Sequence, residues 1–239
     1  MSVIDILQLD FEAGDVLEEH DHDQGQILFA RSGTMDLTTD GRLYVIPSSR
    51  LAWIPSKLVH SIRFRNRTEL RTAYVRAEKA AKIFSDTRIF EASPLFRELL
   101  LRLVESDDVD PQFRRLLEDT LLAELLQLRD EGLSVRFPKD LRALRVANAL
   151  IGHPADDRSL SDWAELAACS SKTLSRLFIQ QTDMTFQLWR RHVRLLAAIE
   201  HLEKGHSITE TAHRVGFATS SAFAEAHRLT FGYPPSATR

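Results

Sequence analysis

Three histidines and a glutamine in the first quarter of the chain have the spacing of a metal or ligand site. His20 and His22 are separated by one residue, so on a strand both imidazoles lie on the same face. Gln26 follows four residues later, and His60 lies in a separate strand-like segment. Imidazole nitrogens and an amide oxygen suit a divalent transition metal, so we expect Zn, Ni, Mn, Fe or Cu. The alternative is a solvated pair of histidines beside the acids of residues 18–23, and both interpretations stay open.

A second group of residues suits contact with nucleic acid. Residues 171–181 are expected to form a helix in which Leu174, Leu177 and Phe178 face the core. The opposite face then carries hydroxyl and cationic side chains that can contact phosphates or base edges in a major groove: Ser171, Lys172, Ser175 and Arg176. The alternative is an ordinary solvated helix surface.

The segment that contains this helix is duplicated later in the chain. The Ser-x-x-acid pattern of a capping box starts at Ser159 and again at Ser207. Small residues recur at the same offset, with Ala164 matching Ala212 and Ala168 matching Gly216. Each copy predicts a helix, a tight turn and a second, reading helix, which is the helix-turn-helix arrangement. In the second copy the expected DNA-contacting residues are Ser220, Ser221 and Arg228.

A long helix over residues 185–204 is expected to join the two copies. Trp189 falls on its apolar stripe and is expected to be core. Three arginines, Arg190, Arg191 and Arg194, lie off that stripe, where each meets either phosphate or solvent. Twenty residues give a helix of about 30 Å, close to the roughly 34 Å of one duplex turn. Two reading helices at that separation meet successive major grooves.

Charge and composition narrow the class of protein. The 239 residues carry a formal net charge of −3, but residues 1–157 hold −6 and residues 158–239 hold +3. A basic C-terminal third is compatible with a polyanionic partner. The single cysteine excludes an intramolecular disulfide framework and a cysteine-cluster zinc site, and it fits a reducing cytoplasm. No apolar run approaches the roughly 18 residues that span a membrane, so no membrane partner is expected.

The chain is expected to have several domains. Short β-rich runs separated by turn residues, with a hairpin turn at Asp40-Gly41, predict an all-β sandwich or barrel in residues 1–92. Leucine-rich helices opening at Ser93-Pro94 and Asp110-Pro111 predict a helical connector in residues 93–136. Residues 137–239 are expected to be an all-α domain that holds both helix-turn-helix motifs.

Residues 140–239 resemble the DNA-binding domain of AraC/XylS-family transcriptional regulators. The motifs that carry the resemblance are Ser170-x-x-x-Leu174-x-Arg176-x-Phe178, the joining segment with Trp189, Gly216-Phe217-x-Thr219-x-Ser221-x-Phe223, and Phe231-Gly232-Tyr233-Pro234-Pro235. Two positions depart from the family pattern. Ala168 stands where the first turn often has glycine, and His227 stands where the second reading helix usually has a core aromatic, so we expect looser packing there.

Residues 9–78 resemble a cupin barrel. The first motif runs from Gly14 through His20, His22 and Gln26 to Gly33, and a degenerate second motif is Pro55-x-Lys57-x-x-His60. Gln26 replaces the usual glutamate ligand, which should weaken binding of a divalent metal. The resemblance implies a barrel interior that holds a small ligand, with Phe29, Trp53 and Phe64 as candidate lining residues or plain core.

Together the two resemblances imply a ligand-responsive transcriptional regulator with no catalytic residues. A subgroup of the family that begins with a cupin domain includes a regulator of nitroimidazole resistance. The implied partners are double-stranded promoter DNA, a small-molecule effector and RNA polymerase, and a homodimer through the leucine-rich helices is the alternative to packing between domains. A second hypothesis is a metal-dependent cupin enzyme, a dioxygenase or isomerase, with an accessory helical domain. A third is a small-molecule-binding protein that does not contact DNA.

Overall fold

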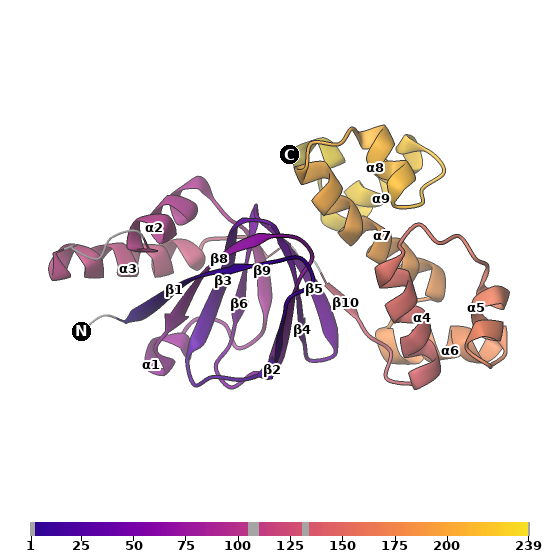
Figure 1. Ribbon diagram of the computed structural model, residues 1–239, viewed down its shortest axis with the longest axis horizontal. Coiled ribbons are helices and arrows are strands. Elements are labelled where there is room, and N and C mark those ends of the chain that lie inside the picture. The colour runs from indigo at the N-terminus through magenta and orange to yellow at the C-terminus, as the bar shows by residue number, and fades with distance from the viewer. Residues whose placement is uncertain (1–2, 105–109, 131–133, 239) are drawn as a thin grey trace. The chain divides into compact units, whose positions relative to one another are not determined.

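The computed structural model describes residues 3–104, 110–130 and 134–238 (Figure 1). They form two compact units, each with its own core. Unit 1 comprises residues 1–40 and 44–132, and unit 2 comprises residues 41–43 and 133–239. The β-rich N-terminal part and the helical C-terminal part confirm the expected fold class.

Unit 1 is built from two antiparallel sheets. The first has the order β1-β8-β3-β6-β9, and the second has the order β10-β5-β4-β7-β2, in which the short β10 and the start of β5 group with unit 2. The strands are β1 (Ile4–Phe11), β2 (Val16–His20), β3 (Gly25–Ser32), β4 (Thr34–Thr39), β5 (Arg42–Pro47), β6 (Arg50–Ile54), β7 (His60–Phe64), β8 (Thr68–Val75), β9 (Arg88–Glu91) and β10 (Ser134–Arg136).

The expected hairpin turn at Asp40-Gly41 is confirmed between β4 and β5. Asp40 has φ of 50° and Gly41 has φ of 66°. A two-residue hairpin that follows the twist of its strands needs positive φ at both central residues, which aspartate and glycine tolerate best.

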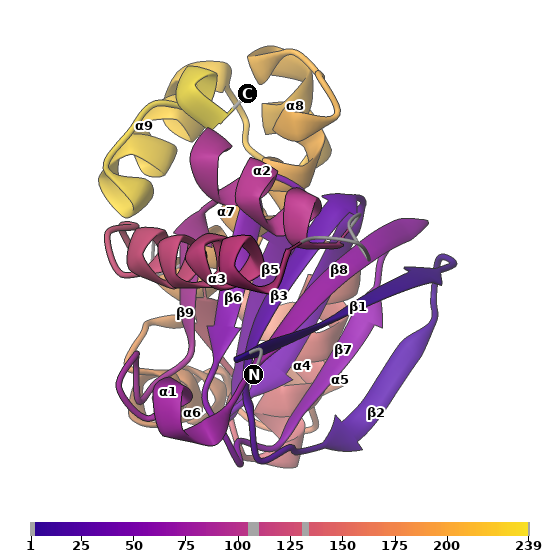
Figure 2. The same ribbon diagram turned by 90° about the vertical axis from the view of Figure 1, so that its left-hand side faces the viewer.

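Helices cover one face of the first sheet. After the short α1 (Ala77–Ala80), α2 (Pro94–Val104) and α3 (Pro111–Leu125) pack on side chains of β1, β3, β6 and β8 (Figures 1 and 2). The buried leucines of both helices and the inward residues of the sheet form one apolar cluster. The helices that we expected in a separate connector therefore share the core of the sheets, and residues up to 132 belong to unit 1.

Unit 2 is helical, and the helices expected over residues 171–181 and 185–204 lie within one residue of their observed bounds. The helices are α4 (Leu141–Gly152), α5 (Leu160–Leu166), α6 (Ser171–Thr182), α7 (Phe186–Glu203), α8 (Ile208–Arg214), α9 (Ser220–Phe231) and the 3-10 helix η1 (Pro235–Thr238). Trp189 is fully buried, as expected for a core residue. No helix in the described part of the chain combines the length and the apolar character needed to cross a membrane.

His227 takes the place of an aromatic core residue in α9. Its side chain is fully buried, its ring meets the edges of Phe223, Phe231 and Tyr233, and its Nδ1 lies 2.9 Å from the Tyr233 carbonyl. We expected looser packing at this position. That expectation was wrong, because the imidazole fills the aromatic site and also finds a hydrogen-bond partner.

Candidate functional site

The first helix-turn-helix motif consists of α5, a tight turn and α6. A capping box starts α5, in which the Ser159 hydroxyl accepts from the Asp162 N–H and the Asp162 carboxylate accepts from the Ser159 N–H. Ser170 caps α6 by accepting from the Thr173 N–H. Leu174, Leu177 and Phe178 are buried, as the sequence predicted. The local sequence therefore fixes where both helices begin and which face α6 turns to the core.

The outer face of α6 carries the four residues predicted to contact DNA. Lys172 and Arg176 are exposed, and Ser171 and Ser175 are half-buried beside them. Within the part of the chain that the structure describes, neither the Lys172 nor the Arg176 side chain makes an ion pair or hydrogen bond. Two cations one helical turn apart, both unpaired, are available to a phosphate or a guanine edge.

The second motif, α8 and α9, repeats this architecture. The Ser207 hydroxyl accepts from the Glu210 N–H at the start of α8, and Thr219 caps α9. Ser221 and Arg228 are exposed on α9, and Ser220 is half-buried. Gly216 in its turn has φ of +87°, and Ala168 in the first turn has φ of +52°. The predicted duplication is therefore a structural one, down to the backbone conformation of the two turns.

Ala168 holds a left-handed conformation that costs an L-residue about 1–2 kcal/mol. Replacing Ala168 with glycine is therefore expected to stabilise unit 2 by about 0.5–1 kcal/mol, because relief of strain exceeds the added entropy of the unfolded chain. Thermal unfolding measures it. Ala167→Gly is the matched control, since Ala167 has φ of −86° and is buried, and that change should destabilise. Loss of stability in Ala168→Gly would contradict the strain argument.

A groove of about 500 Å³ lies between α7 and α9 in unit 2. Its lining includes Gln187 and three arginines of α7, with Glu225 and Leu229 on the α9 side. The arginines are Arg190, Arg191 and Arg194. Arg191 is exposed, and the sequence placed it with Arg190 and Arg194 off the apolar stripe of this helix, with phosphate or solvent as the expected contact.

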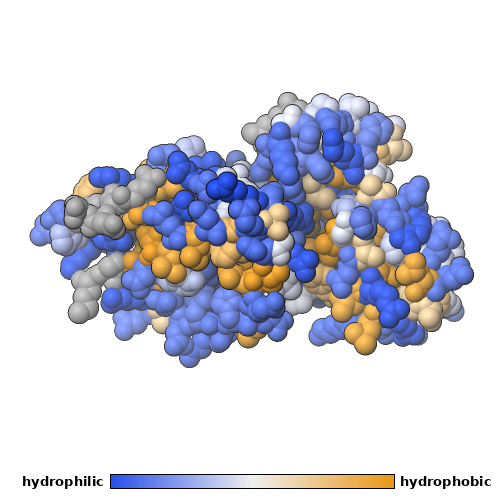
Figure 3. Space-filling view, viewed as in Figure 1, coloured by the Kyte–Doolittle hydropathy of each residue, from blue (hydrophilic) through white to orange (hydrophobic). Residues whose placement is uncertain are grey.

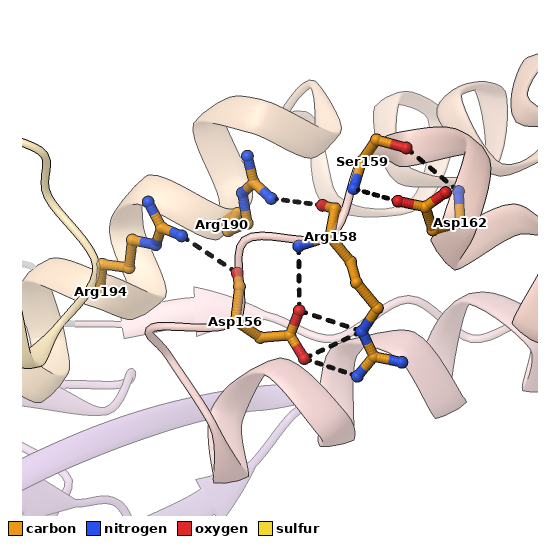
Figure 4. A network of polar contacts seen from close by, with 6 residues as sticks. All are labelled: Asp156, Arg158, Ser159, Asp162, Arg190 and Arg194. Atoms are coloured by element: carbon orange, nitrogen blue, oxygen red, sulfur yellow. Dashed lines mark hydrogen bonds and ion pairs between the residues drawn. The ribbon is translucent and has the colours of Figure 1, made fainter.

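Arg190, which the sequence assigned to DNA contact, directs two donors into unit 2. Its Nη1 donates to the Arg158 carbonyl at 2.9 Å and its Nη2 donates to Gln187 Oε1 at 2.8 Å (Figure 4 shows the contact with Arg158). Its guanidinium also lies 5.4 Å from the centre of the Phe186 ring. Burial lowers the pKa of Arg190. These contacts leave Arg190 on the wall of the groove rather than projecting from it.

The histidines predicted as ligands come together in unit 1. The ring centre of His60 lies 4.4 Å from that of His20 and 5.1 Å from that of His22. His22 Nε2 lies 3.1 Å from Gln26 Oε1, and the Gln26 amide donates to Thr72 Oγ1 and the Tyr74 hydroxyl at 2.9 and 3.2 Å. We call His20, His22, Gln26 and His60 the histidine cluster.

Each imidazole of the histidine cluster is oriented by the backbone. Nδ1 lies 2.7 Å from the Glu18 carbonyl in His20, 2.6 Å from the Gln24 carbonyl in His22 and 2.8 Å from the Leu58 carbonyl in His60. A carbonyl only accepts, so Nδ1 carries the proton, and in His20 and His60 Nε2 keeps a lone pair. In His22, Nε2 instead faces the Gln26 amide oxygen, which also only accepts. Burial lowers the pKa of His60 to about 4, so this ring is neutral at neutral pH. His60 Nε2 is buried and has no hydrogen-bond partner among the described residues.

The cluster as it lies is not a formed coordination site. Among the described residues, no three histidine, cysteine, aspartate or glutamate side chains are placed to hold one metal ion. The donor chemistry fits a metal, since three imidazoles and an amide oxygen lie in one cluster, but the side chains must move to converge on a common point.

The three residues proposed to line a ligand pocket separate onto two faces. Phe29 and Trp53 lie in the cluster that packs under α2 and α3, on the opposite face of β3 from Gln26. Phe64 shares its face of β7 with His60 and stacks on Phe11 with ring centres 3.9 Å apart. Of the three, Phe64 therefore lies on the face of the histidine cluster.

Apolar side chains near this face reach the surface. Leu7 and Leu9 of β1 pair with Thr72 and Leu70 of β8 and are 48% and 40% exposed. Figure 3 shows orange, apolar side chains gathered in the part of unit 1 that contains β1. The histidine cluster thus has both polar donors and exposed apolar surface in the same unit.

A unit with two joined helix-turn-helix motifs beside a separate two-sheet unit defines a DNA-binding regulator with its own ligand-binding domain. Comparison with known proteins agrees. A family model described as an AraC-like ligand binding domain matches residues 10–138, and one described as a helix-turn-helix domain matches residues 163–239. The chain belongs to the AraC family: it is a helix-turn-helix transcriptional regulator with an AraC-like ligand-binding domain.

Two named relatives support the assignment. The HTH-type transcriptional regulator NimR of Escherichia coli K12 is 27% identical over 219 residues, which are 90% of this chain and 80% of NimR. The transcriptional regulator RipA of Corynebacterium glutamicum is also 27% identical over 219 residues, 88% of this chain and 60% of RipA. A crystal structure of Vibrio cholerae ToxT with a bound unsaturated fatty acid is 12% identical with a TM-score of 0.42, covering 98% of this chain and 94% of ToxT. NimR and RipA are named as transcriptional regulators, which supports a regulator rather than a metal-dependent cupin enzyme.

Proposed function

We propose that this regulator recognises its promoter with α6 and α9 in successive major grooves. The observation that carries the proposal is the pair of unpaired cations, Lys172 and Arg176, on the outer face of α6. The 18 residues of α7 span about 27 Å, which is near one duplex turn. A footprint on DNA upstream of the regulator's own gene tests this, and two protected stretches about one turn apart are expected. Protection of a single stretch would contradict it.

The effector is a small molecule whose polar end binds the histidine cluster. The imidazoles, the Gln26 amide and the Tyr74 hydroxyl can donate to or accept from such a group, and the exposed Leu7 and Leu9 offer apolar contact. An effector shifts DNA affinity only if it binds one arrangement of the chain better than another. Titration of candidate effectors into a gel-shift assay is the test. An effector that acts equally on wild type and His60→Ala does not bind at this cluster.

A divalent transition metal is the second candidate for the same cluster. The buried, unpartnered Nε2 of His60 and the three backbone-oriented imidazoles favour it. His20, His22, His60 and the Gln26 amide oxygen would hold the ion, and Zn, Ni, Mn, Fe or Cu is the expected class. A bound cation would give an anionic effector a partner.

Replacing Gln26 with glutamate is expected to raise the affinity for a divalent metal by about tenfold or more, because a carboxylate adds a negative ligand beside the imidazoles. Titration of zinc and nickel against a competing chelator measures it. Gln24→Glu adds the same charge two residues away, where Gln24 donates to Asp5 rather than to the cluster, and should change affinity little. Equal affinity of wild type and Gln26→Glu for both metals would contradict the proposal that the histidine cluster binds a divalent metal.

A homodimer through the outer face of α2 and α3 is part of the proposal. Leu95, Phe113 and Leu116 are 52%, 47% and 61% exposed, while the other faces of both helices pack on the sheet. Leu116→Glu is expected to weaken self-association by about tenfold or more, because it places like charges at a two-fold interface. Gln112→Glu is the charge-matched control on α3. Unchanged oligomeric state in sedimentation of Leu116→Glu would exclude this face.

The proposal also includes RNA polymerase as a partner and the cytoplasm as the location of the protein. A promoter-bound regulator acts where the DNA is, so we place it in the cytoplasm. Transcription with purified polymerase tests whether the two proteins work together. Promoter activity that does not change on adding the regulator would remove polymerase from its partners.

A further inference from the structure

Arg194 lies near the middle of α7, the helix that joins the two helix-turn-helix motifs. Its guanidinium donates to three backbone carbonyls: Nε to Pro154 at 2.9 Å, Nη2 to Asp156 at 3.0 Å and Nη1 to Gly216 at 2.7 Å. Pro154 and Asp156 belong to the loop that leads into α5, and Gly216 belongs to the turn between α8 and α9. One side chain therefore joins the loop that precedes the first motif to the turn of the second motif (Figure 4 shows the contact with Asp156).

The two backbone segments that Arg194 joins also touch each other. A Cβ atom on Gly216 would lie 2.8 Å from the Cα of Ala155 and 2.9 Å from Cζ of Arg194. Gly216 also has φ of +87°. The turn can approach the loop and the guanidinium this closely because its residue has no side chain.

The loop that accepts from Arg194 is itself held rigidly. Arg190, one turn earlier on α7, donates to the Arg158 carbonyl at 2.9 Å. The Arg158 guanidinium pairs with the Asp156 carboxylate and lies 3.9 Å from the centre of the Trp163 ring on α5 (Figure 4 shows the ion pair). Movement of the loop would therefore carry the start of α5 with it.

The apolar packing of α7 is divided between the motifs. Near its N-terminal end, Phe186 and Trp189 meet Phe178 of the first motif. Towards its C-terminal end, Leu195, Ala198 and Leu202 belong to a cluster with α8 and α9. A helix that connects two such clusters can bend gently, and a lateral tie at its middle resists that bending.

We propose that Arg194 is a positioning residue that fixes the distance and angle between the two motifs and so sets the half-site spacing that the regulator accepts. This inference rests on α6 and α9 being the reading helices. Each of its three nitrogens donates to a carbonyl inside unit 2, so we assign Arg194 to the geometry of the motifs rather than to contact with DNA. Burial and the neighbouring Arg190 lower the pKa of Arg194, consistent with a group enclosed by the protein.

The test is the full-length Arg194→Ala variant on the footprinted operator. The DNA series has the native spacing between half-sites, spacings changed by one or two base pairs, and each half-site alone. Affinity for native spacing is expected to fall on the order of tenfold, because the second contact loses effective concentration. Affinity for single half-sites should change by less than about twofold, and the dependence of affinity on salt should keep its slope because no phosphate contact is lost. Equal loss on every DNA, or no loss on any, overturns the proposal.

Two further variants separate geometry from charge. Arg194→Lys keeps the charge but lacks the planar fork that reaches both segments. We therefore expect that, as with alanine, DNA affinity depends less on the spacing between half-sites. Full recovery of the preference by lysine would overturn the geometric account. Gly216→Ala disturbs the same contact from the other side and should also flatten it. If Arg194→Ala fails to fold, as judged by thermal unfolding, Arg194→Lys decides the question, because it keeps the charge and adds no backbone strain.

Arg191→Ala is the matched control on α7. Arg191 is exposed and lines the groove, so its loss should weaken binding to all DNAs alike and reduce the salt slope by about one. A flattened spacing preference in Arg191→Ala would overturn the proposal. If the wild type itself shows no preference among spacings, the assignment of α6 and α9 as joint readers fails. A wild-type preference that Arg194→Ala retains removes only the role of Arg194.

Discussion

Replacing Trp189 with alanine is expected to destabilise unit 2 by about 3–5 kcal/mol and to abolish specific DNA binding. Trp189 is fully buried, its ring centre lies 5.3 Å from that of Phe178, and its Nε1 donates to the Arg136 carbonyl at 2.8 Å. Alanine would leave a cavity between α6 and α7 and an unpaired carbonyl. Because domains have net stabilities of about 5–15 kcal/mol, this loss is a large share of the total. Differential scanning calorimetry measures it.

In the same calorimetric experiment, the unfolding of unit 1 serves as an internal reference. Unit 1 has a separate core, so a transition belonging to unit 1 should keep its temperature while that of unit 2 falls. Leu141→Ala is the matched control for loss of apolar surface, because Leu141 is 76% exposed on α4 and should cost less than about 0.5 kcal/mol. An unchanged calorimetric profile for Trp189→Ala would contradict the assignment of this side chain to the core.

Replacing Arg176 with alanine is expected to weaken specific operator binding by about 1–3 kcal/mol if its guanidinium reads a base. Arg176 is exposed on α6, follows Lys172 by one turn and has no side-chain partner among the described residues. The side chain therefore has no competing interaction to give up on binding DNA. Its substitution should leave the stability of unit 2 within about 0.5 kcal/mol.

Lys172→Ala distinguishes base reading from phosphate contact. A phosphate contact weakens binding to all sequences by a similar factor and lowers the salt slope by about one. A base contact changes the preferred sequence at one position. Competition binding against an operator library separates these outcomes. If Arg176→Ala lowers specific and non-specific affinity equally, then Arg176 contacts phosphate and does not read a base.

The sequence predicted nearly all the helices of unit 2. Capping residues such as Ser159, Ser170 and Ser207 define helix starts through local hydrogen bonds, and these do not depend on the rest of the chain. The strands were harder to predict. The sequence did not indicate β1, β6, β9 or β10, and it placed His22 on the strand of His20, although β2 ends at His20. A strand is stabilised by pairing with distant segments, as β1 is by β8.

The candidate sites show the same division. Spacing indicated that His20, His22, Gln26 and His60 belong together, and the structure brings them into one cluster. It did not indicate that Phe29 and Trp53 face α2 and α3, because a side chain's face follows from sheet register and from which layer covers each face. Sequence also assigned Arg190 to DNA, whereas its contacts lie within unit 2.

The sequence by itself determined the class of this protein: the order of its elements, the duplicated motif and the cation pair on α6. These are local features, encoded by periodicity and capping over a few turns of chain. The tertiary structure decided that α2 and α3 complete the core of unit 1. It also decided that Arg194 joins the backbone at Pro154 to the backbone at Gly216, 62 residues further along the chain. Such contacts depend on how packed elements bring distant backbone carbonyls within reach of one guanidinium, and no local pattern specifies that.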